Sequence, residues 1–281
     1  EIRDLDVDII SGTGERMAFL ALLEQAVHEK EPILTVDDIR YRRTFEVLPA
    51  GGMAERTRAM LKVEDGCVNF CTYCIVPQAR GKVRSKAPDE IIEEVRGLIA
   101  NGYREVVLTG IETASWGKDL GREVDLADLL CAVDRIPGIG RVRLGSLDPS
   151  LMKPEFVNRI AKLKSLTPHF HLSMQSGSDK ILALMKRKYN QKMALEALDA
   201  LTGKIPFFEV NTGAIARALR TSPYPSENLL YILRKVDANI ILSSDSHQKD
   251  TLDFGFTEAK KYLKEIGFTQ LCTIDNGEFV K

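Results

Sequence analysis

The sequence predicts an α/β fold, a complete or partial βα barrel of the TIM type with about six to seven parallel strands. Two observations predict it. From about residue 59 onward, short apolar segments alternate with longer amphipathic ones, which is typical of parallel strands joined by crossover helices. Polar residues or glycine stand where several of these strands end, as they do at the mouth of a barrel.

The predicted strands are short runs rich in branched apolar residues, bounded by polar residues or glycine. The first follows a segment without clear period, residues 31–56, which we predict to be a linker containing one strand. The strands are predicted at 59–63, 105–110, 141–147, 169–174, 207–213, 239–246 and 270–274.

The predicted helices carry apolar residues at helical spacing. The helix over 87–102 also has an acidic first turn and ends at a glycine, both ordinary helix signals. The long segment 178–203 is predicted to be helical with a break near Asn190. The remaining helices are predicted at 17–30, 124–136, 153–165, 226–236 and 256–267.

Composition narrows the class of protein. The 281 residues are 44% hydrophobic and 28% charged with a net charge of −1, as in ordinary globular proteins. No apolar run approaches the roughly 20 residues of a membrane span. Five cysteines, most of them clustered, favour metal or redox chemistry over a disulfide framework. We therefore predict a cytoplasmic protein with no membrane partner.

Three of the cysteines lie in "EDGCVNFCTYCIVPQARGKVRS" and have the spacing C-x3-C-x2-C. A structural zinc site takes four ligands, and the two distant cysteines are better interpreted as small buried apolar residues. Three thiolates suit a [4Fe–4S] cluster in which one iron keeps an open position. A zinc knuckle or a chance cluster is the alternative. The three residues are Cys67, Cys71 and Cys74.

This spacing, with the aromatic Tyr73 before the third cysteine, resembles the radical S-adenosylmethionine (AdoMet) superfamily. The resemblance implies a βα barrel of the radical SAM type with a [4Fe–4S] cluster. It also implies AdoMet bound at the open iron and cleaved reductively to a 5′-deoxyadenosyl radical. An electron donor such as flavodoxin or ferredoxin would supply the electron.

Four separated motifs over about residues 1–190 resemble the tRNA methylthiotransferases, and most closely the branch acting on threonylcarbamoyladenosine beside the anticodon. The resemblance implies tRNA as partner and methylthiolation of a modified adenosine. It also implies a radical SAM core over 56–190, preceded over 1–55 by a remnant of an N-terminal domain and a linker. The motifs are "DGCVNFCTYCIVPQARGKVRS", "VVLTGIETASWGKDL", "RVRLGSLDPSLM" and "HFHLSMQSGSDKILALMKRKY".

Residues at the predicted strand ends are the candidates for the AdoMet pocket, together with Tyr73; turn formation or helix capping is the alternative for each. His169 and His171 alternate along a predicted strand, and we interpret both as structural. The strand-end candidates are Gly110, Glu112, Ser146 and Gln175.

A run of positive charge follows the cysteines at Arg80, Lys82 and Arg84. On an extended segment these side chains would share one face, which suits contacts to RNA phosphates. A solvated edge strand would show the same pattern.

Two parts that the methylthiotransferase resemblance implies are not found in the sequence. One is an N-terminal domain with a second cluster on three further cysteines, of which only an apparent tail over about 1–30 is present. The other is a C-terminal RNA-binding β-barrel. We therefore expect AdoMet cleavage to be better supported than the full sulfur-insertion reaction.

Residues 191–281 resemble instead the end of histidinol phosphatases of the polymerase-and-histidinol-phosphatase (PHP) superfamily. The resemblance implies a remnant Zn or Mn site at Asp245 and His247, and phosphate contacts from Arg217 and Arg220. The H-x-H pair that opens that family's barrel is missing. The sequence thus reads as a hybrid joined near Asn190, and two alternatives stay open: a metal-dependent phosphoester hydrolase of the histidinol phosphatase type, or a catalytically incomplete hybrid.

Overall fold

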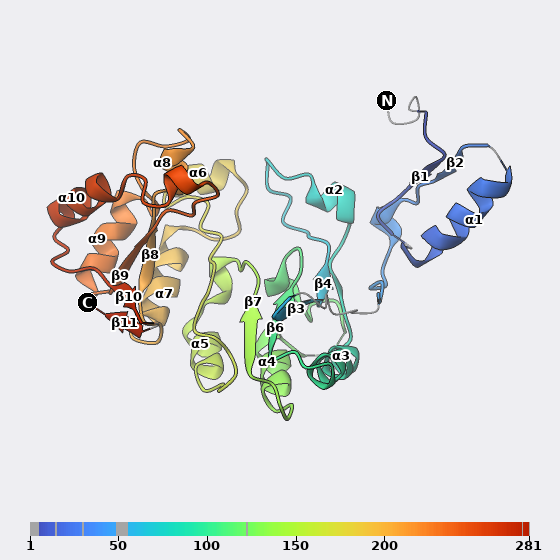
Figure 1. Cartoon of the computed structure of the whole chain (residues 1–281), viewed down its shortest axis with the longest axis horizontal. Helices are drawn as coiled ribbons and strands as arrows, with labels where there is room; N and C mark the ends of the chain where they lie inside the picture. The colour runs from blue at the N-terminus through green and yellow to red at the C-terminus, as the bar shows by residue number, and fades with distance from the viewer. Residues whose placement is uncertain are drawn as a thin grey trace. The chain divides into compact units, whose positions relative to one another are not determined.

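The alternation of strands and helices after residue 59 is present in the computed structural model (Figure 1). The structure describes residues 6–14, 16–29, 31–48, 56–121, 123–276 and 278–280. The chain divides into two compact units. The first unit consists of residues 1–148 and 162–173, and the second of residues 149–161 and 174–281.

A three-stranded parallel sheet forms the centre of the first unit, in the order β3-β6-β7. The middle strand, β6, is buried over its three central residues, as expected when helices cover a parallel sheet. Leu108 of β6 is in register with Leu61 on one side and Leu144 on the other, and all three are buried. The strands are β3 (Arg58–Lys62), β6 (Glu105–Thr109) and β7 (Arg141–Leu144).

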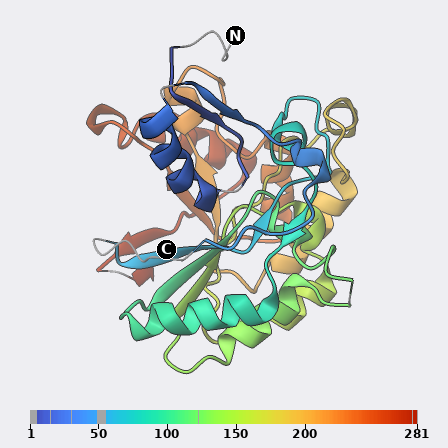
Figure 2. The ribbon, with the colours of Figure 1, turned by 90° about the vertical axis from the view of Figure 1, so that its right-hand side faces the viewer.

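Two helices connect these strands, α3 (Pro88–Ala100) and α4 (Leu126–Asp134). Proline stands in the first turn of α3, where its missing N–H costs nothing. Asp125 caps α4 by accepting the backbone N–H of Asp128 at 2.9 Å. The two helices pack against each other below the sheet in the view of Figure 2.

The N-terminal part of the first unit is a small β-α-β arrangement. Strands β1 (Ile9–Ser11) and β2 (Ile33–Thr35) pair in parallel, and α1 (Phe19–Glu29) lies alongside them (Figure 2). The helix predicted over 17–30 is therefore confirmed, preceded by the 3-10 turn η2 (Arg16–Ala18), whereas β1 was not predicted. The predicted linker contains β2 and the 3-10 turn η3 (Ile39–Tyr41); its residues 49–55 lie outside the described part of the chain.

The second unit contains a two-stranded parallel sheet, β8 (Phe208–Asn211) and β9 (Ile240–Ser243). Val210, Leu230, Ile240 and Leu263 are among the residues of its apolar core, which joins these strands to α9 and α10. The other elements of this unit are η5 (Pro149–Leu151), α5 (Pro154–Ile160), α6 (Asp179–Leu184), α7 (Gln191–Leu201), α8 (Gly213–Ala216), α9 (Glu227–Lys235), η6 (Lys249–Thr251), α10 (Phe256–Ile266) and the antiparallel pair β10 (Thr273–Asp275) and β11 (Glu278–Val280).

The predicted break near Asn190 is confirmed, because the long segment forms two helices, α6 and α7. The side chain of Asn190 caps α7 by accepting the backbone N–H of Met193 at 2.9 Å. The carboxylate of Asp179, at the start of α6, accepts the N–H of Gln191 at 2.6 Å. These bonds replace the ones that a continuous helix would make.

The α/β class with parallel strands is confirmed and is consistent with a partial βα barrel. One element was predicted wrongly. Residues 169–174 form no strand in the described structure, because Leu172 makes only a single parallel bridge to Leu147. Regular parallel pairing among the described residues after residue 56 is limited to β3-β6-β7 and β8-β9, fewer strands than the six to seven predicted.

Candidate functional site

The three clustered cysteines lie in a loop that leaves the carboxyl end of β3. The short strand β4 (Glu64–Asp65) follows β3, and the loop then runs from Gly66 to Gly81; we call residues 66–81 the cysteine loop. The loop ends in the short helix α2 (Val76–Arg80), and β5 (Arg84–Ser85) returns antiparallel to β4. Cys71 is buried, and Cys67 and Cys74 are partly exposed.

The cysteine loop is bonded to the carboxyl end of β6. The side-chain amide of Asn69 donates to the carboxylate of Glu112 at 3.2 Å, and the backbone N–H of Asn69 approaches the sulfur of Cys67 at 3.4 Å. Gly110, the first residue after β6, packs against Glu64: a side chain at position 110 would place its Cβ 2.7 Å from a carboxylate oxygen of Glu64. The predicted site residues Gly110 and Glu112 therefore lie beside the cysteine loop.

Glu64 is the most strongly perturbed acid of this region. Its side chain is fully buried, one carboxyl oxygen accepts the backbone N–H of Glu112 at 2.7 Å, and the other has no hydrogen-bond partner among the described residues. Burial raises the pKa of Glu64 to about 8, and the nearby carboxylates of Asp65 and Glu112 add to the rise. Glu64 is therefore a neutral acid at pH 7.

Ser146 and His171 meet at the carboxyl end of β7. Their Oγ and Nδ1 atoms are 3.0 Å apart, so His171 contacts a predicted pocket residue. Tyr73 lies on the cysteine loop and is 54% exposed. Gln175, the last candidate for the AdoMet pocket, belongs to the second unit.

The comparisons with known proteins decide the family. The sequence matches the family model of the Radical SAM superfamily over residues 61–214, which is more than half of the chain. The chain belongs to the radical SAM superfamily. The matched span begins in β3 and includes the cysteine loop, β6 and β7. The resemblance inferred from the cysteine spacing is therefore confirmed.

Curated relatives of this radical SAM chain are tRNA methylthiotransferases. It is 37% identical to the threonylcarbamoyladenosine tRNA methylthiotransferase MtaB of Bacillus subtilis over 74% of this chain and 46% of that protein. It is 37% identical to the tRNA-2-methylthio-N(6)-dimethylallyladenosine synthase of Desulfitobacterium hafniense over 82% of this chain and 51% of that protein. An MtaB of Aquifex aeolicus is 35% identical over 93% of this chain and 62% of that protein. The chain thus spans about half the length of these relatives.

These matches do not support the predicted change of family near Asn190. The radical SAM match runs to residue 214. The alignment with the Aquifex protein takes in 261 of the 281 residues and therefore extends far past residue 190. The resemblance of residues 191–281 to PHP histidinol phosphatases has no support from them, and the hydrolase alternative is not favoured.

The donor set of the cysteine loop fits the cluster of the radical SAM family. Members of this superfamily use a [4Fe–4S] cluster with AdoMet, and thiolates are the usual ligands of such clusters. Among the described residues, no three His, Cys, Asp or Glu side chains gather about a single-ion site. Burial raises the pKa of the Cys67 thiol, so iron binding must displace its proton.

The prediction for the basic run is wrong in its geometry. The three residues do not share one exposed face: Arg80 ends α2, and Arg84 lies in β5 with 3% of its side chain exposed. Both arginines contact the carboxylate of Asp65. Lys82 is exposed between them and stays a candidate for RNA contact.

The predicted remnant metal site in the second unit is not assembled as expected. Asp245 has a positive φ of 46°, so the chain turns after β9 and the alternation of an extended strand does not apply. The ring Nδ1 of His247 lies 2.9 Å from the backbone oxygen of Asp245, whose carboxylate pairs with Arg217 at 3.4 Å. Arg220 stacks over the ring of Tyr224 at 4.2 Å.

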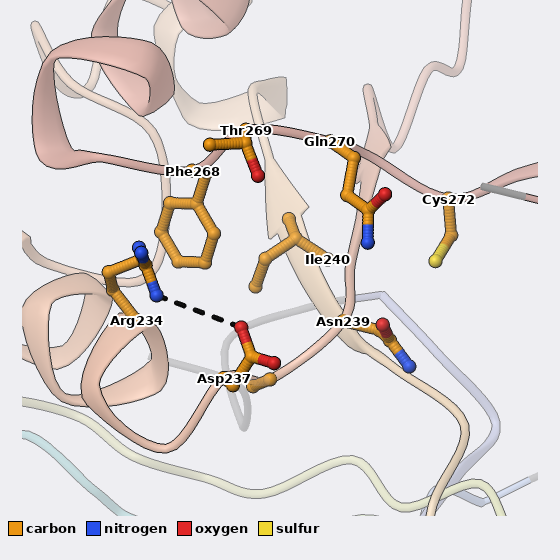
Figure 3. Close-up of a pocket in the computed structure, with 9 residues that line it drawn as sticks. Arg234, Asp237, Asn239, Ile240, Phe268, Thr269, Gln270 and Cys272 are labelled. Carbon is orange, nitrogen blue, oxygen red and sulfur yellow. Dashed lines mark ion pairs between the residues drawn. The ribbon is translucent and has the colours of Figure 1, made fainter.

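A small cavity of about 40 Å³ lies at the amino end of β9, with room for a few water molecules (Figure 3). Ile240, Phe268 and Cys272 supply part of its wall. At its edge Arg234 forms an ion pair with Asp237 at 3.7 Å. Sites of βα barrels lie at the carboxyl ends of strands, so we do not assign this cavity a function.

Sequence reasoning missed Glu64 and Asp65, the two acids directly before the cysteine loop. Both are buried in the structure, and both contact the elements that hold the loop. A signal was available in the sequence. Two acids directly follow the alternating strand "AMLKV", where the chain enters a Gly-Cys turn, and isolated acids are seldom buried without a specific partner.

No helix among the described residues is long and apolar enough to cross a membrane.

Proposed function

We propose that this chain is the AdoMet-cleaving barrel of a tRNA methylthiotransferase that acts on a modified adenosine beside the anticodon. One observation carries the proposal: the three-cysteine loop leaves the carboxyl end of β3 and is bonded to Glu112 just after β6. The names of the relatives support the tRNA substrate and the methylthiolation reaction. Because the chain spans about half of those proteins, the whole reaction is part of the proposal.

In this proposal Cys67, Cys71 and Cys74 would hold a [4Fe–4S] cluster, and AdoMet would bind beside it. Such a cluster, with flavodoxin, ferredoxin or a similar electron donor, would supply the electron for reductive cleavage of AdoMet, and hydrogen abstraction from an adenine C–H would follow. The clustering of three of the five cysteines supports a cytoplasmic location in this proposal.

In this proposal the residues around the cysteine loop position the loop and the AdoMet beside it. Gly110 leaves space against Glu64, while the carboxylate of Glu112 is held by Asn69. A neutral Glu64 adds no negative charge beside the cysteine loop. Tyr73, Ser146 and Gln175 stay candidates for contacts to AdoMet.

RNA contact is assigned in this proposal to Lys82, because it is the member of the basic run that is exposed. An exposed lysine contacts phosphate through charge and carries no sequence information by itself. Recognition of the modified adenosine therefore needs other residues.

The proposal is tested by anaerobic reconstitution with iron and sulfide. The chain should gain a broad brown absorbance near ~400 nm from iron–sulfur charge transfer. A triple Cys67→Ala, Cys71→Ala, Cys74→Ala variant should lose it, whereas Cys131→Ala, which removes a cysteine from α4, should keep it. A wild-type chain that takes up no iron, or a triple variant that still does, would refute the assignment.

The substrate is tested by filter binding with an anticodon stem–loop. Stem–loops with and without the threonylcarbamoyl group are compared at several salt concentrations. Tighter binding of the modified stem–loop is expected. Equal binding of both would remove the support for the threonylcarbamoyladenosine branch.

A further inference from the structure

One buried carboxylate, that of Asp65, contacts three basic side chains beside the cysteine loop. Asp65 accepts Arg80 through two bonds, from Nε and Nη2, each 2.9 Å long. It also accepts Lys62 Nζ at 2.6 Å and lies 3.2 Å from Nη2 of Arg84. A fifth bond comes from the backbone N–H of Gly66 at 2.9 Å. We call Asp65, Lys62, Arg80 and Arg84 the Asp65 network.

The network connects the two ends of the cysteine loop. Asp65 is the residue directly before the loop, and Arg80 is the last residue of α2, just before the loop ends. Beside this pair, the backbone N–H of Cys67 donates to the carbonyl of Gly81 at 3.0 Å. All three thiols therefore lie within a segment whose ends are joined by a two-bond ion pair.

Arg84 fixes the same junction from the neighbouring strand. Its Nη1 donates to the carbonyl oxygens of Arg80 and Lys82 at 2.8 and 2.9 Å. Gly66 has a φ of +90°, and a Cβ there would lie 2.0 Å from the carbonyl oxygen of Lys82. The backbone geometry of the junction is therefore specified by close contacts as well as by charge.

Water competes poorly with these bonds. Only 9% of the Asp65 side chain and 22% of the Arg80 side chain are exposed. Two-bond arginine–carboxylate pairs, such as the one between Arg80 and Asp65, are among the strongest hydrogen-bonded pairs in proteins.

We infer that Asp65 is a positioning residue: with Arg80 it ties the ends of the cysteine loop together and so holds the three thiols in place before iron binds. The role of this ion pair in cluster binding rests on the proposed function, whereas the ion pair between Asp65 and Arg80 does not. A loop whose ends are already joined loses less conformational freedom when its three cysteines bind a cluster. The cluster should therefore bind faster and dissociate more slowly.

The direct test is hydrogen exchange on the iron-free chain, compared between wild type, Asp65→Asn and Arg80→Lys. Arg80→Lys keeps the charge but removes the two-bond fork. In both variants the amides of residues 67–80 should exchange at least about tenfold faster, which corresponds to about 1.4 kcal/mol. Arg96→Lys is the matched control, because Arg96 pairs with Glu93 on the exposed face of α3.

Protection of α3 separates a local effect from general loss of structure. Asp65→Asn leaves Arg84 without its counter-charge and is the variant at risk of unfolding the unit; Arg80 is partly exposed, so Arg80→Lys keeps the test valid. Unchanged protection of the loop in a folded Arg80→Lys variant would overturn the inference. Faster exchange in the loop with α3 unchanged supports it.

A second readout follows iron after reconstitution. Arg80→Lys should release iron to a chelator at least about tenfold faster than wild type, and Arg96→Lys at the wild-type rate. Equal release from Arg80→Lys would overturn the role in holding the cluster. A wild-type chain that binds no iron would contradict the proposed function, and hydrogen exchange would still decide the inference.

Discussion

Replacing Glu64 by glutamine should remove a loss of stability that the wild-type protein suffers as pH rises. The folded pKa of about 8 exceeds the ordinary value of 4.5, so folding favours the protonated carboxyl. The stabilisation from protonated Glu64 is fully present below about pH 4.5. It falls as pH rises towards 8, because the Glu64 carboxyl ionises at lower pH in the unfolded chain than in the folded one. Glutamine does not ionise, and its amide oxygen can still accept the N–H of Glu112.

The magnitude follows from the distance between the two pKa values. Each pH unit between them changes the free energy of unfolding by about 1.4 kcal/mol. We therefore compare the free energy of unfolding of Glu64→Gln with that of wild type. From pH 5 to pH 7 the variant should gain roughly 2–3 kcal/mol relative to wild type. The unpaired amide group adds a cost of about 1–2 kcal/mol that does not depend on pH.

Urea unfolding followed by tryptophan fluorescence measures this directly. The chain has one tryptophan, Trp116, which is 2% exposed in the first unit and donates to the carbonyl of Lys86. Glu93→Gln, at an exposed position on α3, is the matched control. A difference between Glu64→Gln and wild type that stays constant from pH 5 to pH 8, or moves against the variant, would refute the reasoning.

Three further substitutions test the packing and the surface of the same region. Gly110→Ala should destabilise the first unit by about 1–3 kcal/mol in the urea assay, because its Cβ would lie 2.7 Å from a Glu64 oxygen; wild-type stability would contradict the packing. Gly66→Ala should lower iron retention after reconstitution, because the positive φ and the carbonyl of Lys82 both oppose a side chain; full retention would argue against the loop geometry. Lys82→Ala should weaken stem–loop binding in filter assays and reduce its salt slope by about 1, and an unchanged slope would exclude it as a phosphate contact.

The sequence predicted well those features that depend on local signals. The break at Asn190 was predicted, and the structure explains it through the Asn190 cap and the carboxylate of Asp179. The cysteine spacing predicted a three-thiol loop at a strand end, where the structure has it. The Asn190 cap acts on a backbone N–H three positions away, and the three cysteines lie within eight residues, so both signals are local in the chain.

The failures depend on partners far away in the chain or across a sheet. Alternation in the basic run predicted one shared face, but Lys82 is exposed whereas Arg84 is buried beside its register partner Asp65. Residues 169–174 look like a strand, yet only Leu172 has a parallel bridge, to Leu147. The burial of Glu64 likewise depends on Gly110, which follows a different strand.

The short helix α2 shows a third limit. Its five residues, "VPQAR", are too few for a periodic pattern, and the proline in its first turn reads equally well as a loop signal. Yet this helix delivers Arg80 to Asp65. A prediction that treats the cysteine loop as featureless therefore also misses the residue that joins its ends.

The central claim is that this chain binds a cluster on Cys67, Cys71 and Cys74 and uses it to cleave AdoMet. Reductive cleavage, followed as 5′-deoxyadenosine released by the anaerobically reconstituted and reduced chain, tests it most directly. The account predicts product from wild type and from Cys131→Ala, and none from Cys71→Ala. A fully iron-loaded wild-type chain that releases no 5′-deoxyadenosine would contradict it.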